Sequence, residues 1–296
     1  MKVNKKYLTW MFTLPMFWVI VFFVIPFILL LKISFSKGVF DIPPYTEIFT
    51  FVKDSYECIV NFTLANYVNL LDSIYIKSLY SSFGIAVVST LACLIIGYPL
   101  AYAISKYDDD KKVLFLILIF LPFWTSFLIR VYAWISLLSP SGILNSILLS
   151  LHVIDAPLNF SNNIYAVCIG IVYTYLPFMI FPLYSSIEKL DRSYIDAAYD
   201  LGCTPVKTFF KITIPLTING IIAGSILVFL PALGEYLIPE LLGSSSTLTL
   251  GRVIWNDCFE NISWPTSAAL AVVLVMVVFF SSFCFENINK LWSKTK

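Results

Sequence analysis

The chain has 296 residues and a formal net charge of +1; 59% of its residues are hydrophobic and only 12% are charged. A soluble domain carries about 25% charged residues, so this composition excludes a water-soluble enzyme, and the small net charge carries no signal for nucleic acid. The single histidine, His152, excludes mechanisms that need two, and none of the six cysteines forms a C-x-x-C pair. We therefore expect no metal or redox centre.

Six stretches of the chain are long and apolar enough to cross the hydrocarbon core, which takes about 20 residues. The first stretch follows a basic flank, but it is too long for a signal-peptide core and no small-residue cleavage site follows it, so we expect it to be retained. The sequence therefore predicts an all-α, polytopic membrane protein, folded as a single domain over residues 1–296. The predicted spans cover residues 7–31, 78–104, 113–138, 164–187, 216–242 and 266–285.

Lysine and arginine are concentrated in four regions: the two termini and the segments after the second and fourth spans. These regions fall on one side of the membrane if the spans alternate, and an excess of positive charge marks the cytoplasmic side. Both termini are therefore predicted to be cytoplasmic. A disulfide between Cys58 and Cys258, both on the outer side, stays open, and residues 38–76 carry no functional assignment.

The segment between the fourth and fifth spans is the most polar connection between spans. Asp191 or Ser193 can cap a helix over residues 194–201, and Gly202 can end it because glycine readily takes a positive φ. Pro205 suits the first position of a second short helix. We expect two short helices joined by a tight turn at the cytoplasmic surface.

This coupling loop, residues 188–215, contains the pattern D-A-A-x3-G-x9-I-x-I-P. The pattern resembles the EAA loop of ABC importer permeases, E-A-A-x3-G-x9-I-x-L-P. Asp196 replaces Glu and Ile214 replaces Leu, and both changes keep charge or shape. The resemblance implies the type I ABC importer permease fold, with a cytoplasmic EAA coupling helix that an ATPase subunit grips. The implied ATPase-coupling residues are Asp196, Ala197, Ala198, Gly202 and Pro215.

The resemblance covers most of the chain from about residue 80 onward. Residues 120–134 look like the third span of polyamine permeases, and residues 231–243, 251–255 and 261–265 are similar to the putrescine-type branch. This implies a multi-pass permease of the bacterial inner membrane that moves putrescine or spermidine, or both, into the cytoplasm. Another small organic cation or a metal complex remains an alternative cargo. A channel or secondary transporter would show a ring of charges or inverted repeats, and neither is visible.

The family resemblance also implies a division of labour between subunits. The expected partners are a second homologous permease, a pair of ATPase subunits and a periplasmic or surface polyamine-binding protein. None of the glycines is followed by lysine, so the chain lacks the G-x-x-x-x-G-K-[ST] phosphate loop. We therefore expect no enzyme activity and no cofactor in this chain, with ATP and Mg bound by the ATPase. Whether the permeases pair as a homodimer or a heterodimer stays open.

Charged residues within spans are costly and usually functional, and Arg130 in the third span is the first of three. By helical spacing it shares one face with Phe123, Phe127 and Trp134. Arg130 can reach the outer headgroups, form an ion pair with Glu235, or line the transport pathway. The sequence leaves these three interpretations open.

Glu235 and Glu240 lie near the end of the fifth span. Pro231, Gly234 and Pro239 are expected to break the helix around Glu235, and broken backbone at membrane depth is tolerated only beside protein or a water-filled cavity. A carboxylate beside an aromatic ring suits an alkyl ammonium ion. The tryptophans can instead be interfacial anchors, and the loop acids can instead contact a binding protein. The pathway candidates are Glu235, Tyr236, Glu240, Trp124, Arg130, Trp134, Trp255 and Asp257.

Overall fold

The computed structural model describes residues 13, 15–39, 41–47, 49–52 and 57–294. The start of the first predicted span lies outside the described residues. Within this part of the chain, five helices are long and apolar enough to cross a membrane, or six if a helix pair bent by 68° is counted as one span. The chain forms two compact units, residues 1–76 with 253–277 and residues 77–252 with 278–296.

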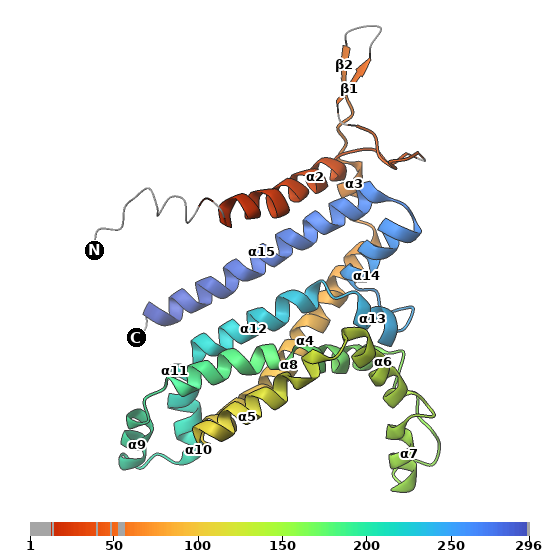
Figure 1. Cartoon of the computed structure of the whole chain (residues 1–296). Coiled ribbons are helices and arrows are strands. Elements are labelled where there is room, and N and C mark those ends of the chain that lie inside the picture. Colours follow the sequence, from red (N-terminus) through yellow and green to blue (C-terminus); the bar gives the residue numbers. More distant parts are fainter. Residues whose placement is uncertain (1–12, 14, 40, 48, 53–56, 295–296) are drawn as a thin grey trace, which may run out of the picture. The chain divides into compact units, whose positions relative to one another are not determined.

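The first unit contains the N-terminal span, which runs from Pro15 to Ser34. A β-hairpin follows it, with Phe49 opposite Val60 (Figure 1), and adds a small β element to the expected all-α fold. The elements of this unit are a π turn Ile20–Val24, α2 Ile25–Ser34, β1 Phe49–Val52, β2 Glu57–Val60, α3 Ala65–Asn69, a π turn Asn256–Glu260 and the first part of α15, Trp264–Lys294.

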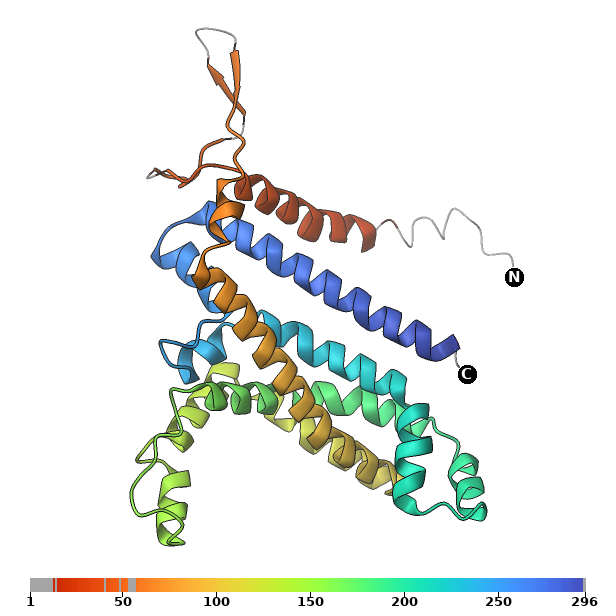
Figure 2. The ribbon, with the colours of Figure 1, turned by 180° about the vertical axis from the view of Figure 1, so that it is seen from behind.

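The second unit contains the remaining helices. They are α4 Ser73–Ser105 (from residue 77), α5 Asp109–Phe120, a 3-10 turn Leu121–Trp124, α6 Phe127–Leu138, α7 Ile143–Ser150, α8 Ile164–Glu188, α9 Ser193–Asp200, α10 Pro205–Thr208, a π turn Phe209–Thr213, α11 Ile214–Leu216, α12 Ile218–Leu233, α13 Leu237–Leu242 and α14 Leu250–Trp255 (to residue 252). Helices α8 and α12 lie side by side in both views (Figures 1 and 2).

The predicted third span, residues 113–138, is not one continuous helix. Helix α5 ends at Phe120, the chain forms one 3-10 turn, and α6 starts only at Phe127. Pro122 lacks the N–H that would continue the α-helical hydrogen bonds, and Thr125 is extended, with φ −91° and ψ 154°. The assumption of one unbroken helical face from Phe123 to Trp134 was therefore wrong.

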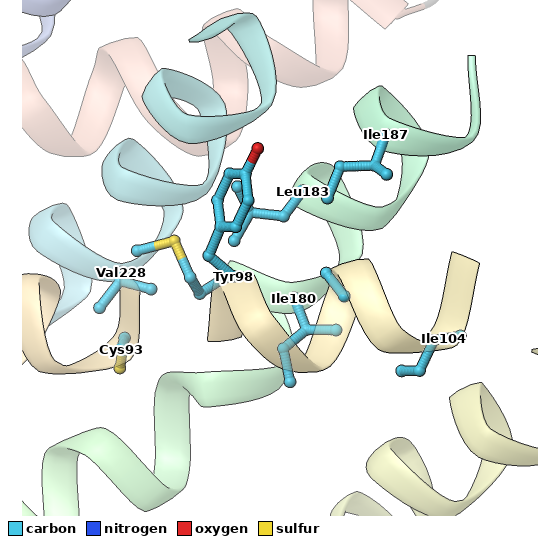
Figure 3. Close-up of a cluster of buried hydrophobic side chains, with 9 residues drawn as sticks. Cys93, Tyr98, Ile104, Ile180, Leu183, Ile187 and Val228 are labelled. Atoms are coloured by element: carbon cyan, nitrogen blue, oxygen red, sulfur yellow. The ribbon is translucent and has the colours of Figure 1, made fainter. Parts of the chain in front are cut away.

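The core of the second unit lies between α4, α8 and α12. Apolar side chains from the three helices meet there (Figure 3), and the one buried polar group among them is satisfied: the Tyr98 hydroxyl lies 2.8 Å from Thr217 Oγ1. Burying these side chains stabilises the packing of the three helices through van der Waals contacts and not through transfer out of water, since lipid is as apolar as they are. The cluster comprises Cys93, Tyr98, Ala101, Ile104, Met179, Ile180, Leu183, Ile187 and Val228.

Close contact between α8 and α12 depends on two glycines of α12. A Cβ at Gly220 would lie 2.5 Å from Ser186 Cβ and 2.8 Å from the Pro182 carbonyl oxygen, and one at Gly224 would lie 2.8 Å from Met179 Sδ. Small residues at such positions let membrane helices approach closely. This contact holds α12, and with it the end of the fifth span, against α8.

We predict that Gly220→Ala lowers stability by about 1–3 kcal/mol, because the added methyl group forces α12 away from the α8 backbone. Gly84→Ala is the matched control: the same change falls on α4, where nothing lies within 4 Å. That change should be neutral or stabilise the helix by up to about 1 kcal/mol. Thermal unfolding of both variants in detergent is the measurement, and equal melting temperatures would contradict the packing role of Gly220.

Candidate functional site

Glu235 lies at a break in the fifth span. Helix α12 ends at Leu233 and α13 begins at Leu237, as the sequence predicted, although Pro231 lies within α12. The Tyr175 hydroxyl on α8 donates a hydrogen bond to Glu235 Oε2, and Ile238 N–H lies 3.4 Å from Oε1. Sequence analysis missed Tyr175, since one tyrosine in an apolar span carries no distinctive signal.

The loop that follows α13 closes over this break. The Thr249 hydroxyl donates to the Glu235 carbonyl oxygen at 3.4 Å. A Cβ at Gly251 would lie 2.6 Å from the Gly234 carbonyl oxygen and 2.8 Å from that of Glu235. The backbone of residues 249–251 therefore packs directly on the unwound residues. The Glu235 carbonyl, which has no helical N–H donor at Pro239, accepts a hydrogen bond from the Thr249 hydroxyl instead.

Arg130 packs on aromatic rings and does not pair with Glu235. Its guanidinium carbon lies 4.7 Å from the Phe123 ring centroid and 5.5 Å from that of Phe127. Two of its nitrogens, Nε and Nη1, are buried and have no hydrogen-bond partner among the described residues. Of the three interpretations that the sequence left open for Arg130, the ion pair with Glu235 is therefore not formed. Arg130 lines a cavity of about 170 Å³ with Phe123, Tyr173 and Pro177.

A run of aromatic rings connects the Arg130 region with Glu235. The Phe123 ring packs edge-on against Phe178 at 5.3 Å, and Phe178 lies 6.3 Å from Tyr175, whose hydroxyl binds Glu235. These side chains come from the turn after α5 and from α8, and α13 packs against both α6 and α8. The two interruptions of helix, near Phe123 and at Glu235, are thus joined by ring contacts within one unit.

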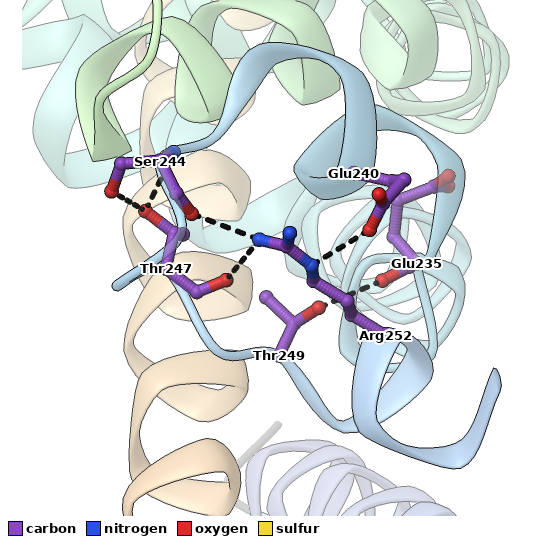
Figure 4. A network of polar contacts seen from close by, with 6 residues as sticks. All are labelled: Glu235, Glu240, Ser244, Thr247, Thr249 and Arg252. Carbon is purple, nitrogen blue, oxygen red and sulfur yellow. Dashed lines mark hydrogen bonds and ion pairs between the residues drawn. The ribbon is translucent and has the colours of Figure 1, made fainter. Parts of the chain in front are cut away.

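Glu240 forms an ion pair with Arg252, which sequence analysis did not select (Figure 4). Arg252 Nε lies 2.7 Å from Glu240 Oε2, although neither atom meets hydrogen-bond geometry, so the contact is electrostatic. Arg252 Nη1 also donates to the Ser244 carbonyl at 2.8 Å and lies 3.5 Å from that of Thr247. Arg252, on α14, therefore contacts both α13 and the loop over residues 243–249, and it neutralises Glu240.

The other pathway candidates have varied surroundings. Trp124 is 84% exposed, and Trp134 packs edge-on against Tyr173 at 5.4 Å. Trp255 lies 4.2 Å from the Phe259 ring, and Tyr236 is half-buried.

Asp257 belongs to the first unit and is buried. It accepts hydrogen bonds from the Tyr75 hydroxyl at 3.0 Å and Asn261 Nδ2 at 2.9 Å. These bonds hold the turn after α14. Cys258, on the same turn, is a free thiol.

The coupling loop forms two short helices, as predicted. Helix α9 covers Ser193–Asp200, Gly202 has a φ of +78°, and Thr204 caps α10 through its side chain. The N-cap of α9 is Arg192 and not Asp191 or Ser193. Asp191 instead accepts a hydrogen bond from Ser193 N–H at 2.9 Å, which holds the pKa of its carboxyl group below its ordinary value.

Exposure divides the coupling residues into two groups. Asp196 and Ala197 are exposed, whereas Ala198 is buried against its own chain. Lys112 forms an ion pair with Glu188 at 2.7 Å, and its pKa is raised by this bond and by the bond to Asp109. This ion pair links the end of α8, from which the coupling loop starts, to the start of α5.

The fold defines the class of protein. A chain of a bacterial ABC transporter involved in alginate import superposes with a TM-score of 0.68 over 96% of both chains, at 18% identity. A chain of the MetNI methionine ABC transporter gives a TM-score of 0.56 over 73% of this chain and 95% of that one, at 14% identity. The architecture is that of an ABC importer permease.

The chain belongs to the family described as binding-protein-dependent transport system inner membrane components, whose model matches residues 113–290. It is 36% identical, over 99% of its length and 97% of the relative's, to the spermidine/putrescine transport system permease protein PotB of Haemophilus influenzae. It is 44% identical to PotB of Escherichia coli over 79% of this chain and 85% of that protein. It is therefore a multi-pass inner-membrane protein.

We predict that Gly202→Val impairs coupling more than folding. A β-branched residue at a positive φ costs about 1–2 kcal/mol, and the strain falls on a turn that orients α9, with nothing within 4 Å of the new Cβ. Association with the ATPase and uptake should drop, while the melting temperature changes little. Gly202→Asn is the control, since Asn tolerates this conformation. Normal ATPase association and transport by Gly202→Val would refute the prediction.

We also predict that Arg252→Gln destabilises the loop over residues 243–249. The side chain of Arg252 is 16% exposed and that of Glu240 is 35% exposed, so the expected cost is about 1–3 kcal/mol, below that of a fully buried pair. Faster proteolysis of this loop and a lower melting temperature are the measurements. The double variant Glu240→Gln/Arg252→Gln should recover most of the loss, because it leaves no unpaired charge. A single variant as stable as the wild type would count against the ion pair.

Proposed function

We propose that this chain is a membrane-spanning permease subunit of an ATP-driven ABC importer that moves polyamines into the cytoplasm. The observation that carries the proposal is the 36% identity, over 99% of the chain, to a permease named for spermidine and putrescine transport. A likeness over nearly the whole length includes both the membrane helices and the coupling loop. The cargo therefore follows from the relatives, and the site supports it.

Glu235 has the chemistry that a polyamine requires. Because Arg252 neutralises Glu240, Glu235 is the carboxylate without an ion pair in the described segment of residues 218–255. Its partner, the Tyr175 hydroxyl, occupies a position that a substrate ammonium can take by exchange. The Tyr175 ring carries this hydroxyl, and the Phe178 ring lies 6.3 Å from the Tyr175 ring; aromatic faces attract cations.

The remaining parts of the proposal concern the partners. A second permease completes the pathway, a pair of ATPase subunits contacts the exposed face of α9 through Asp196 and Ala197, and a polyamine-binding protein delivers the substrate from outside. ATP and Mg are bound by the ATPase, which performs the hydrolysis. Both termini lie in the cytoplasm, in agreement with the lysines of the terminal regions.

The test is uptake of labelled putrescine and spermidine by the native cell, with and without this gene. Deletion should abolish uptake, and the wild-type gene should restore it. Glu235→Gln keeps the side-chain shape but removes the charge, so uptake should stay at least tenfold below the wild type. Tyr175→Phe, which keeps the ring, should change uptake less.

Asp72→Asn is the control, because it removes an exposed carboxylate outside the pathway. Its uptake should equal that of the wild type once membrane abundance has been matched by immunoblotting. Unchanged polyamine uptake after deletion would refute the polyamine cargo. Full uptake by Glu235→Gln would remove Glu235 from the pathway but leave the cargo standing.

A further inference from the structure

The first unit contains a pocket that none of the pathway candidates lines. Its volume is about 520 Å³, and its described walls come from two segments far apart in the sequence, residues 38–39 with 41–44 and residues 260–263. Both segments belong to the stretches predicted to lie outside the membrane. The lining residues are Gly38, Val39, Asp41, Ile42, Pro44, Glu260, Asn261, Ile262 and Ser263.

The pocket is held in shape before anything binds. The Tyr45 ring stacks on Trp264 at 6.3 Å and joins the two walls. Ser263 N–H donates to the Asp257 carbonyl at 2.8 Å, and the Asp257 carboxylate accepts from Asn261 Nδ2 at 2.9 Å. Ile262 has a φ of +51°, a rare conformation for a β-branched residue, so surrounding contacts impose the path of this turn.

The surface of the pocket is apolar with two carboxylates. Asp41 and Glu260 are exposed, and no lysine or arginine is among the described residues that line the pocket. Ile42 is 96% exposed and Ile262 is 61% exposed. Large exposed aliphatic side chains beside a rigid pocket are typical of protein contact surfaces, whereas organic cations are usually bound by aromatic walls.

We propose that this pocket is a docking surface for the binding protein, which inserts a lysine or arginine side chain between Asp41 and Glu260 while apolar residues cover Ile42 and Ile262. The inference rests on the proposed function, because it takes the partner to be a polyamine-binding protein. Membership of a binding-protein-dependent family requires such a protein to contact the outer side. Because the described residues that line the pocket include two carboxylates and no basic side chain, a basic residue is the complementary partner. This surface gives the outer segment of residues 38–44 a function.

The experiment measures the affinity of spermidine-loaded binding protein for the complete importer in lipid nanodiscs. In the chain, Asp41→Lys/Glu260→Lys should weaken binding at least tenfold, because the inserted charges repel a basic side chain. Wild-type affinity should fall with added salt, whereas the affinity of the variant should rise, because salt screens an attraction in the first and a repulsion in the second. Glu47→Lys is the matched control: it makes the same charge change on an exposed outer residue outside the pocket, and its affinity should stay near that of the wild type.

A second variant, Ile42→Ser, tests the apolar part of the surface without risk to folding, since the side chain is almost fully exposed. It should weaken docking about three- to tenfold.

Wild-type affinity in both the charge and the Ile42 variants would overturn the proposal. A second result would also overturn it: free spermidine binds directly to the wild-type importer, and the charge variant loses this binding but still docks the binding protein. The pocket would then be a polyamine site. A wild-type importer that docks the protein but imports no polyamine would refute the proposed cargo and leave this surface standing.

Discussion

The site depends on one constraint: a helix interrupted within the membrane must satisfy its backbone groups inside the protein. Helix α12 ends at Leu233, and the chain turns through Gly234 and Glu235 before α13 begins. The Glu235 carbonyl receives the Thr249 hydroxyl, and the close approach of Gly251 excludes any side chain there. The loop after α13 is therefore part of the same structure as the break that it covers. The Glu235 carboxylate therefore lies half-buried in a segment whose backbone is not helical.

The two carboxylates near the break differ in their partners. Arg252 neutralises Glu240 and holds two loop carbonyls, so this glutamate stabilises the loop. Glu235 has a neutral partner, the Tyr175 hydroxyl, which a cation can displace at a lower cost than an ion pair would impose. Arg130 is stacked on Phe123 and Phe127, a contact that a guanidinium makes well. Aromatic contacts thus replace the ion pair that spacing alone suggested.

Each of the two units contains a similar local support. In the second unit, on the side predicted to be cytoplasmic, Lys112 and Glu188 form an ion pair at the end of α8, and Gly202 turns the chain where Asp196 and Ala197 are exposed. On the predicted outer side, bonds to Asp257 fix the turn that presents Glu260 and Ile262. Rigid mounting of exposed residues reduces the entropy lost when a partner binds.

The sequence by itself determined the membrane class, the spans other than the third, the turn at Gly202 and the break near Glu235, because hydropathy and the backbone limits of glycine and proline are local properties. Only the tertiary structure decided which groups meet. Arg252 reaches Glu240, and Tyr175 reaches Glu235 from 60 residues away, and neither contact leaves a periodic signal. The interruption of the helix after Phe120 places Phe123 in a turn, away from the helical face that spacing assigned to it together with Phe127 and Arg130. Side-chain partners across helices are set by how helices pack, and packing depends on the whole fold.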